Sequence, residues 1–294
     1  MTEIVTFFAV GVMLGRRQGA SEAASQLLDR AVLDWLLPLT IVFQVSRVVW
    51  GLHSLWIIGL CFAITALDAV LIFLACRWFR IDGATQRTLL LVAPLGNTAY
   101  FGFSAVTAIM GADGLPDAIV FDQLGTTLMF ATYANWVANS QVVVDRTTVL
   151  QLTRMPALWG LVGGTLLSLT GVDLLNGPVG SLGLAISASL LPLSMIALGT
   201  RVTLSGLKRF RELAIGIGVR TVVGPALLLT AVVPLTDLDS SMPAALLQTG
   251  MPSMIGAALL AGRHGLDKEL AYSMCVVGVP VALVTLPLLH LFIR

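Results

Sequence analysis

Two stretches of this sequence decide its fold, and they read Leu95-Gly96-Asn97-Thr98-Ala99-Tyr100-Phe101-Gly102 and Thr249-Gly250-Met251-Pro252-Ser253-Met254-Ile255-Gly256. Each lies near the centre of an apolar run long enough to cross a membrane, and each contains residues that weaken a helix. Gly exposes the backbone, Pro lacks a donor, and Asn, Thr and Ser offer backbone groups other hydrogen-bond partners. In hydrocarbon an open backbone is tolerated only where protein or a water-filled cavity covers it. Two such breaks at corresponding positions of two halves indicate a transport site.

The composition is that of a protein that crosses the membrane many times. Of the 294 residues, 57% are hydrophobic and 11% are charged, whereas a soluble domain carries roughly 25% charged residues. The formal net charge is +1 and there is no basic tail, so nucleic acid is not an expected partner. The three cysteines lie in apolar runs without metal-ligand spacing. We therefore expect neither a metal site nor a cofactor.

Hydropathy predicts an all-α membrane protein with ten spans. The expected spans are 3–15, 31–49, 55–76, 88–110, 117–136, 155–170, 180–202, 212–233, 243–262 and 270–293. The first is shorter than the roughly 20 residues that a crossing needs, so it either spans with help from its neighbours or lacks N-terminal residues. The polar linker 138–154 separates two five-helix halves, 1–137 and 155–294.

Lys and Arg are concentrated in the loops that follow odd-numbered spans. Loops after even-numbered spans are nearly bare, with Arg47 and the terminal Arg294 as the exceptions. The positive-inside rule therefore predicts a multi-pass protein of the cell (inner) membrane with both termini on the extracytoplasmic side.

The second half repeats the first at a fixed offset. Pro38 and Pro192 stand 154 positions apart, and so do Arg47 and Arg201. Further pairs with this offset are Gly96 with Gly250, Gly102 with Gly256, Gly111 with Gly265, and Asp113 with Asp267. Because each half holds an odd number of spans, the second copy enters the membrane from the opposite side, which predicts an inverted repeat. Chance similarity between apolar segments is the alternative.

The two breaks are expected at the same depth in the membrane. Asn97 lies about nine residues into its span from the inside, and Pro252 about nine into its span from the outside, which is about 14 Å at 1.5 Å per residue. Both breaks then fall near the bilayer midplane, where half-helix N-termini present free N–H groups and positive dipole ends. Such a place suits an anion, most simply a carboxylate.

At these residues the sequence resembles the auxin efflux carrier family, which includes plant auxin exporters and bacterial transporters of dicarboxylates such as malonate and malate. The family is related to the bile acid/sodium symporter-like superfamily. The motifs that carry the resemblance, over nearly the whole chain, are Gly96-Asn97-Thr98 with Gly102, Asp122, Met251-Pro252-Ser253 and Gly265-Leu266-Asp267.

The resemblance implies two inverted five-helix repeats with crossed, broken fourth and ninth helices. The first, second, sixth and seventh helices would form a scaffold, often the contact of a homodimer. The other six would form a transport domain that carries the substrate past the scaffold in an elevator-type movement. Three departures from the family pattern, Gly96, Ser104 and Gly278-Val279-Pro280, leave the substrate and any ion site open.

Carried over by position, Asn97, Thr98, Pro252 and Ser253 would line the substrate site. The full set of expected substrate-binding residues is Gly96, Asn97, Thr98, Tyr100, Gln248, Met251, Pro252 and Ser253.

Ionisable residues inside spans are costly and mark functional candidates. We interpret Asp122, with its neighbour Gln123, as a proton-coupling or substrate-gating group. The alternative is a helix-end carboxylate that faces water or caps a neighbouring helix. Asp68 and Arg220 lie at similar depths, and we predict a structural ion pair between the third and eighth spans. The alternative is that Arg220 attracts an anionic substrate.

The sequence therefore predicts a secondary active transporter of a small organic anion, such as a carboxylate, a dicarboxylate or an auxin-like acid, and not an enzyme. Coupling to H⁺ or Na⁺ is left open. A cation/proton antiporter of related inverted-repeat fold is the alternative, although Met251 and Ser253 stand where such proteins usually carry paired Asp residues. An intramembrane serine protease built on Ser104 and His290 is a further alternative without a visible oxyanion motif.

Overall fold

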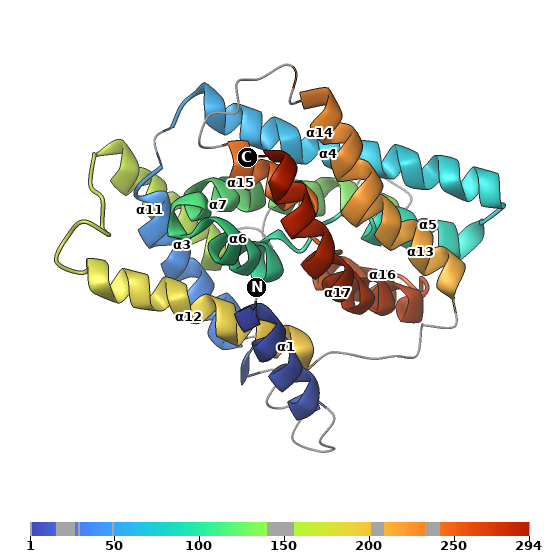
Figure 1. The fold of residues 1–294 in the computed structure, drawn as a ribbon, viewed down its shortest axis with the longest axis horizontal. Helices are drawn as coiled ribbons and strands as arrows, with labels where there is room; N and C mark the ends of the chain where they lie inside the picture. The colour runs from blue at the N-terminus through green and yellow to red at the C-terminus, as the bar shows by residue number, and fades with distance from the viewer. Residues whose placement is uncertain are drawn as a thin grey trace.

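The computed structural model describes residues 2–15, 27–28, 30–48, 50–139, 156–200, 209–232, 234 and 242–293. Within these ranges the chain is almost entirely helical (Figure 1). The predicted linker 138–154 lies, from residue 140 onwards, outside the described residues.

The helices of the first half follow the predicted spans. They are α1 (Thr2–Gly15), the π-helical η1 (Ala31–Leu36) with α3 (Leu37–Val45), α4 (Leu52–Phe79), α5 (Gly83–Val92), and η2 (Thr98–Gly102) with α6 (Phe103–Met110). After the short η3 (Ala112–Gly114), a run without gaps consists of α7 (Leu115–Val120), η4 (Phe121–Thr126), α8 (Thr127–Met129), η5 (Phe130–Ala134) and α9 (Asn135–Asn139).

The helices of the second half follow the prediction equally closely. They are α11 (Pro156–Leu169), α12 (Gly180–Gly199), α13 (Phe210–Gly218) with η7 (Val219–Val223) and α14 (Gly224–Val232), α15 (Met242–Thr249), α16 (Ile255–Arg263) and α17 (Lys268–Ile293). Four helical segments are long and apolar enough to cross a membrane: Leu52–Phe79, Gly180–Ala197, Phe210–Val232 and Lys268–Ile293. The outward face of α4 carries exposed Leu55, Trp56, Leu74 and Trp78, an apolar surface that suits contact with lipid.

Two groups of helices lie on different sides of the molecule (Figure 1). In one group α1 packs along α12, and α11 packs along α3. The backbones approach closely there, because a Cβ atom at Gly160 would lie 2.6 Å from the carbonyl oxygen of Pro38. A small residue such as Gly160 permits this close approach of two helices. The other group contains α5, α13, α16 and α17, which contact one another.

The buried side chains form two clusters that meet at the broken segments. One cluster joins α3, α12 and α15 through residues such as Ile41, Leu190 and Leu247. The second joins α5, α13, α16 and α17 through residues such as Leu89, Leu213, Ala258 and Met274. Leu95 belongs to the second cluster, whereas Phe101 and Met251 belong to the first. The breaks are therefore covered by protein on both sides, as an open backbone in an apolar chain requires.

Candidate functional site

Both apolar runs are interrupted where the sequence predicts, and the two interruptions lie against each other. The N–H of Asn97 donates to the carbonyl of Pro252 (2.6 Å), and the N–H of Met254 donates to the carbonyl of Leu95 (2.9 Å). Gly96 and Ser253 form the antiparallel bridge between them. The two open segments thus satisfy part of each other's backbone hydrogen bonding.

Glycine is required at two positions of the first break by close approach of buried side chains. A Cβ at Gly96 would overlap Nη2 of Arg220 and lie 3.1 Å from its Cζ. A Cβ at Gly102 would overlap Oε1 of Gln248 and lie 3.0 Å from its Cδ. Since Arg220 and Gln248 are both almost fully buried, neither side chain has space into which it can move.

Each break ends at the start of a new helix. Asn97 caps the first, because its Oδ1 accepts a hydrogen bond from the N–H of Phe101 (3.4 Å). Met254, in extended conformation, precedes α16. The first N–H groups of a helix have no partner within the helix and carry the positive end of its dipole. Two such helix starts therefore lie next to each other.

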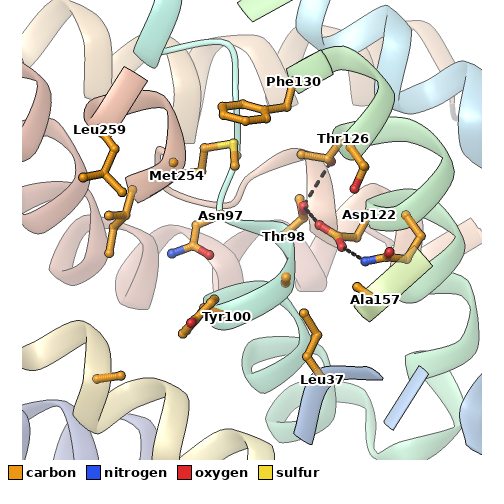
Figure 2. Close-up of a pocket in the computed structure, with 17 residues that line it drawn as sticks. Leu37, Asn97, Thr98, Tyr100, Asp122, Thr126, Phe130, Ala157, Met254 and Leu259 are labelled. Atoms are coloured by element: carbon orange, nitrogen blue, oxygen red, sulfur yellow. Dashed lines mark hydrogen bonds between the residues drawn. The ribbon is translucent and has the colours of Figure 1, made fainter. Parts of the chain in front are cut away.

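A cavity of about 270 Å³ opens beside the two helix starts (Figure 2). The first break contributes the backbone and side chains of residues 96–100, and the second contributes residues 254–256. The remaining wall comes from Asp122, Gln123, Thr126, Thr127 and Phe130, from Leu259, and from Leu37, Ala157 and Ala197 of α3, α11 and α12. Within the described residues, no Lys or Arg side chain lines this cavity.

A chain of polar contacts joins the first break to the helix that carries Asp122 (Figure 2). Oγ1 of Thr98 donates to Oδ1 of Asp122 (2.5 Å) and lies 3.0 Å from Oγ1 of Thr126. Nε2 of Gln123 donates to Oδ2 of Asp122 (2.5 Å). Asp122 is 6% exposed. Its carboxylate thus lies at the edge of the cavity and accepts hydrogen bonds from two side chains. A change in the charge of Asp122 would act directly on Thr98, the first residue of η2.

Arg220 and Asp68 lie in contact behind the breaks. Nη1 of Arg220 is 2.9 Å from Oδ2 of Asp68, and both side chains are buried. The guanidinium also donates to the carbonyls of Pro94 and Met251. Arg220 is not among the residues that line the cavity.

The expected substrate-binding residues fall into two sets. Gly96, Asn97, Thr98 and Tyr100 line the cavity, together with Asp122 and Gln123. The residues that do not line it are Gln248, Met251, Pro252 and Ser253, all of them buried. Gln248 instead joins the first break to α7, because its Nε2 donates to the carbonyls of Thr98 (3.0 Å) and Ala118 (3.2 Å).

Several cavity residues were missed at the level of sequence. Thr126 and Phe130 stand four and eight positions after Asp122, on the same face of one helical run, and this spacing was the available signal. Met254 and Ile255 follow the Pro-Ser pair of the second break, where α16 begins. Ala157 and Ala197 come from distant helices, and nothing in their local sequence marks them.

Together, a covered pair of broken helices, a cavity at their junction and lipid-suited outer faces define a multi-pass membrane transporter. The family model described as "Membrane transport protein" matches residues 1–290. The chain is also similar to an "Uncharacterized transporter" of Methanothermobacter thermautotrophicus, with 26% identity over 294 residues that cover 98% of this chain and 96% of the relative. The chain therefore belongs to the membrane transport protein family, which is the auxin efflux carrier family that its motifs resemble.

Membership of this family identifies a transporter and not an enzyme. The protease alternative is therefore set aside. In the structure the hydroxyl of Ser104 donates to the carbonyl of Tyr100 (2.9 Å), one turn back along its own helix.

Proposed function

We propose that this protein is a secondary active transporter of a small organic acid, which binds in the cavity beside the two breaks. The observation that carries the proposal is the position of this cavity of about 270 Å³, against the starts of two half-helices and the side chain of Asn97. A volume just below the range of roughly 300–1,000 Å³ for ligand pockets favours a small substrate.

The chemistry of the walls favours an anion that is held without a salt bridge. The helices that start at Thr98 and Ile255 bring their N-terminal N–H groups and the positive ends of their dipoles to the cavity. The amide of Asn97 adds a donor beside them. Leu37, Phe130 and Ile255 supply an apolar wall for the rest of the molecule. The two helix starts lie next to each other and so form one group of donors. A monocarboxylate with an apolar body matches this arrangement better than a dicarboxylate, which needs a separate group of donors at its other end.

We propose that Asp122 couples proton binding to substrate binding. A carboxylate substrate and the carboxylate of Asp122 repel each other strongly in a partly desolvated cavity. Binding is favoured when a proton neutralises one of the two. We therefore assign Asp122 the proton-coupling role, with Gln123 and Thr98 as the side chains that hold it in place.

For the architecture we propose ten spans in two inverted five-helix repeats, 1–137 and 155–294. Both termini lie on the extracytoplasmic side of the cell membrane in this arrangement. The offset of 154 positions and the antiparallel meeting of the breaks support this plan. The helices α1, α3, α11 and α12 would form the scaffold and the dimer contact. Leu37, Ala157 and Ala197 of that group line the cavity opposite the breaks. In an elevator-type mechanism the substrate site moves past the scaffold, so scaffold residues are expected to form one wall of the site.

Binding to purified protein in lipid nanodiscs tests the proposal. Thermal unfolding is measured with phenylacetate, butyrate, malonate and the neutral phenylacetamide, each at pH 5.5 and pH 7.5. We expect saturable stabilisation by the monocarboxylates, stronger at the lower pH, and little or none by malonate or the amide. Equal stabilisation by phenylacetate and its amide would contradict an anion site.

A matched pair of variants localises the binding. Asn97→Asp keeps a capping oxygen and adds a negative charge at the cavity, so it should abolish stabilisation by phenylacetate. Asn139→Asp adds the same charge on an exposed residue at the end of α9 and should leave it unchanged. Loss of binding in both variants, or in neither, would place the ligand elsewhere.

One observation favours the cation/proton antiporter as the second candidate. Asp122 and the hydroxyls of Thr98 and Thr126 place several oxygens at one edge of the cavity. Proteoliposomes with a trapped pH dye separate the two functions. An antiporter releases internal protons when Na⁺ or K⁺ is added without any carboxylate, whereas the proposed transporter responds only to the acid.

A further inference from the structure

Arg220 binds more than its partner Asp68. Its Nη1 donates to Oδ2 of Asp68 (2.9 Å) and to the carbonyl of Pro94 (3.2 Å), while its Nε donates to the carbonyl of Met251 (2.9 Å). Arg220 is 1% exposed and Asp68 is 0% exposed. One buried cation thus joins both broken segments to α4.

The two carbonyls that Arg220 binds occupy corresponding places. α5 ends at Val92 and α15 ends at Thr249, so each carbonyl stands two residues beyond the C-terminal end of a half-helix. The C-terminal end of a helix is the negative end of its dipole and attracts cations. In transporters with broken helices, such half-helix ends and unwound carbonyls are the groups that coordinate a coupling ion such as Na⁺.

We propose that Arg220 is a built-in cation, whose guanidinium occupies the position at which a sodium-coupled protein of this plan would bind Na⁺. An arginine side chain carries its charge permanently and does not dissociate. The positive charge at the junction therefore travels with the helices in every conformation, and Na⁺ has no role at this position. The inference rests on the proposed transport function, because it concerns the coupling of the same site.

The chain around Arg220 is shaped to hold the guanidinium. A Cβ at Gly96 would overlap its Nη2, and a Cβ at Gly224 would overlap Oδ1 of Asp68. Two glycines on different elements thus leave the space that the ion pair fills.

Removal of the guanidinium leaves a set of oxygens suited to a hard cation. The carboxylate of Asp68 and the carbonyls of Pro94 and Met251 would face the vacated space, and carboxylate and carbonyl oxygens are the ligands that such cations prefer. Oδ1 of Asp68 has no hydrogen-bond partner in the described part of the chain, so it is already available. Arg220→Ala should therefore acquire a sodium site that the wild type lacks.

The test measures thermal unfolding without substrate, in NaCl and in choline chloride at equal ionic strength. The proteins are the wild type, Asp68→Asn, Arg220→Ala and the double variant Arg220→Ala/Asp68→Asn. We expect the wild type to unfold at the same temperature in both salts. In Arg220→Ala, saturating Na⁺ should raise the Tm by about 5 °C or more relative to choline, and the double variant should lose this rise.

Two results would overturn the proposal. One is a saturable sodium stabilisation of the wild type that Asp68→Asn removes, and the other is a folded Arg220→Ala protein without a sodium response. If Arg220→Ala does not fold, Arg220→Gln takes its place, and the wild type compared with Asp68→Asn still decides. A sodium response that Asp122→Asn removes in every background would instead contradict the proposed function of the cavity. Failure of the inference about Arg220 can therefore be distinguished from failure of the proposed function.

Discussion

The contact between Asp68 and helix α14 provides the sharpest test of how tightly the ion pair is packed. Gly224 is buried at the start of α14, and a Cβ there would overlap Oδ1 of Asp68 and lie 3.0 Å from its Cγ. Non-bonded carbon atoms prefer a separation of about 3.5–4.0 Å. In Gly224→Ala the carboxylate must therefore move by about 1 Å, away from the position in which Arg220 holds it.

The expected loss of stability follows from what that movement breaks. The bond between Nη1 of Arg220 and Oδ2 of Asp68 is 2.9 Å long, and such a shift takes it out of good geometry. Breaking a buried pair costs about 3–5 kcal/mol, because it leaves an uncompensated charge. For a chain of this size, about 3 kcal/mol corresponds to a fall in Tm of roughly 6 °C or more.

The same helical run, Phe210–Val232, supplies the matched control. At Gly218, six residues before Gly224, a Cβ would meet no atom within 4 Å, so Gly218→Ala should be neutral or slightly stabilising through its better helix propensity. The Tm of each variant is measured by intrinsic fluorescence in the same detergent. If Gly224→Ala unfolds no earlier than Gly218→Ala, the carboxylate of Asp68 is not packed tightly against Gly224 and the steric argument is wrong.

Three further predictions concern transport. Asp122→Asn should abolish the pH dependence of uptake into proteoliposomes while the protein stays folded, and Asp117→Asn, on the same helical run but outside the cavity lining, should retain it. The exchange Asp68→Arg with Arg220→Asp should not restore function, because the carbonyls of Pro94 and Met251 would then face a carboxylate. Recovery to wild-type uptake would show that the bonds from Arg220 to the two broken segments are not needed. Ala197→Leu, which adds carbon atoms to the cavity wall, should weaken binding of phenylacetate about tenfold or more and of butyrate less, whereas Ala188→Leu on the exposed face of the same helix α12 should change neither affinity.

The sequence predicts the helices and the breaks because both depend on local chemistry. Long apolar runs set the spans, and Gly96, Asn97 and Pro252 interrupt them wherever the runs are placed. Which residues of the second break face the cavity depends on how the two breaks pair with each other. This pairing joins segments far apart in the sequence, so local chemistry does not predict it. The carbonyl of Pro252 accepts a hydrogen bond from the N–H of Asn97, and Met254 and Ile255, not Pro252, line the cavity. The sequence predicts Asp68 as the partner of Arg220, because both are ionisable residues at similar depths in their spans. It does not predict the carbonyls of Pro94 and Met251, because backbone groups carry no such signal.

Positions that correspond at the offset of 154 now carry different chemistry on the two sides of the junction. Tyr100 corresponds to Met254, and both line the cavity, while Asp122 corresponds to Val276. In the proposed inverted repeat, the first half thus places hydrogen-bonding side chains at the cavity, and the second half places apolar side chains such as Met254 and Ile255 there. A symmetrical dicarboxylate would find hydrogen-bonding side chains on the first side only, because Met254 and Ile255 present a thioether and aliphatic carbons on the second. The asymmetry of the junction is thus a physical reason to test acids with one charged end before those with two.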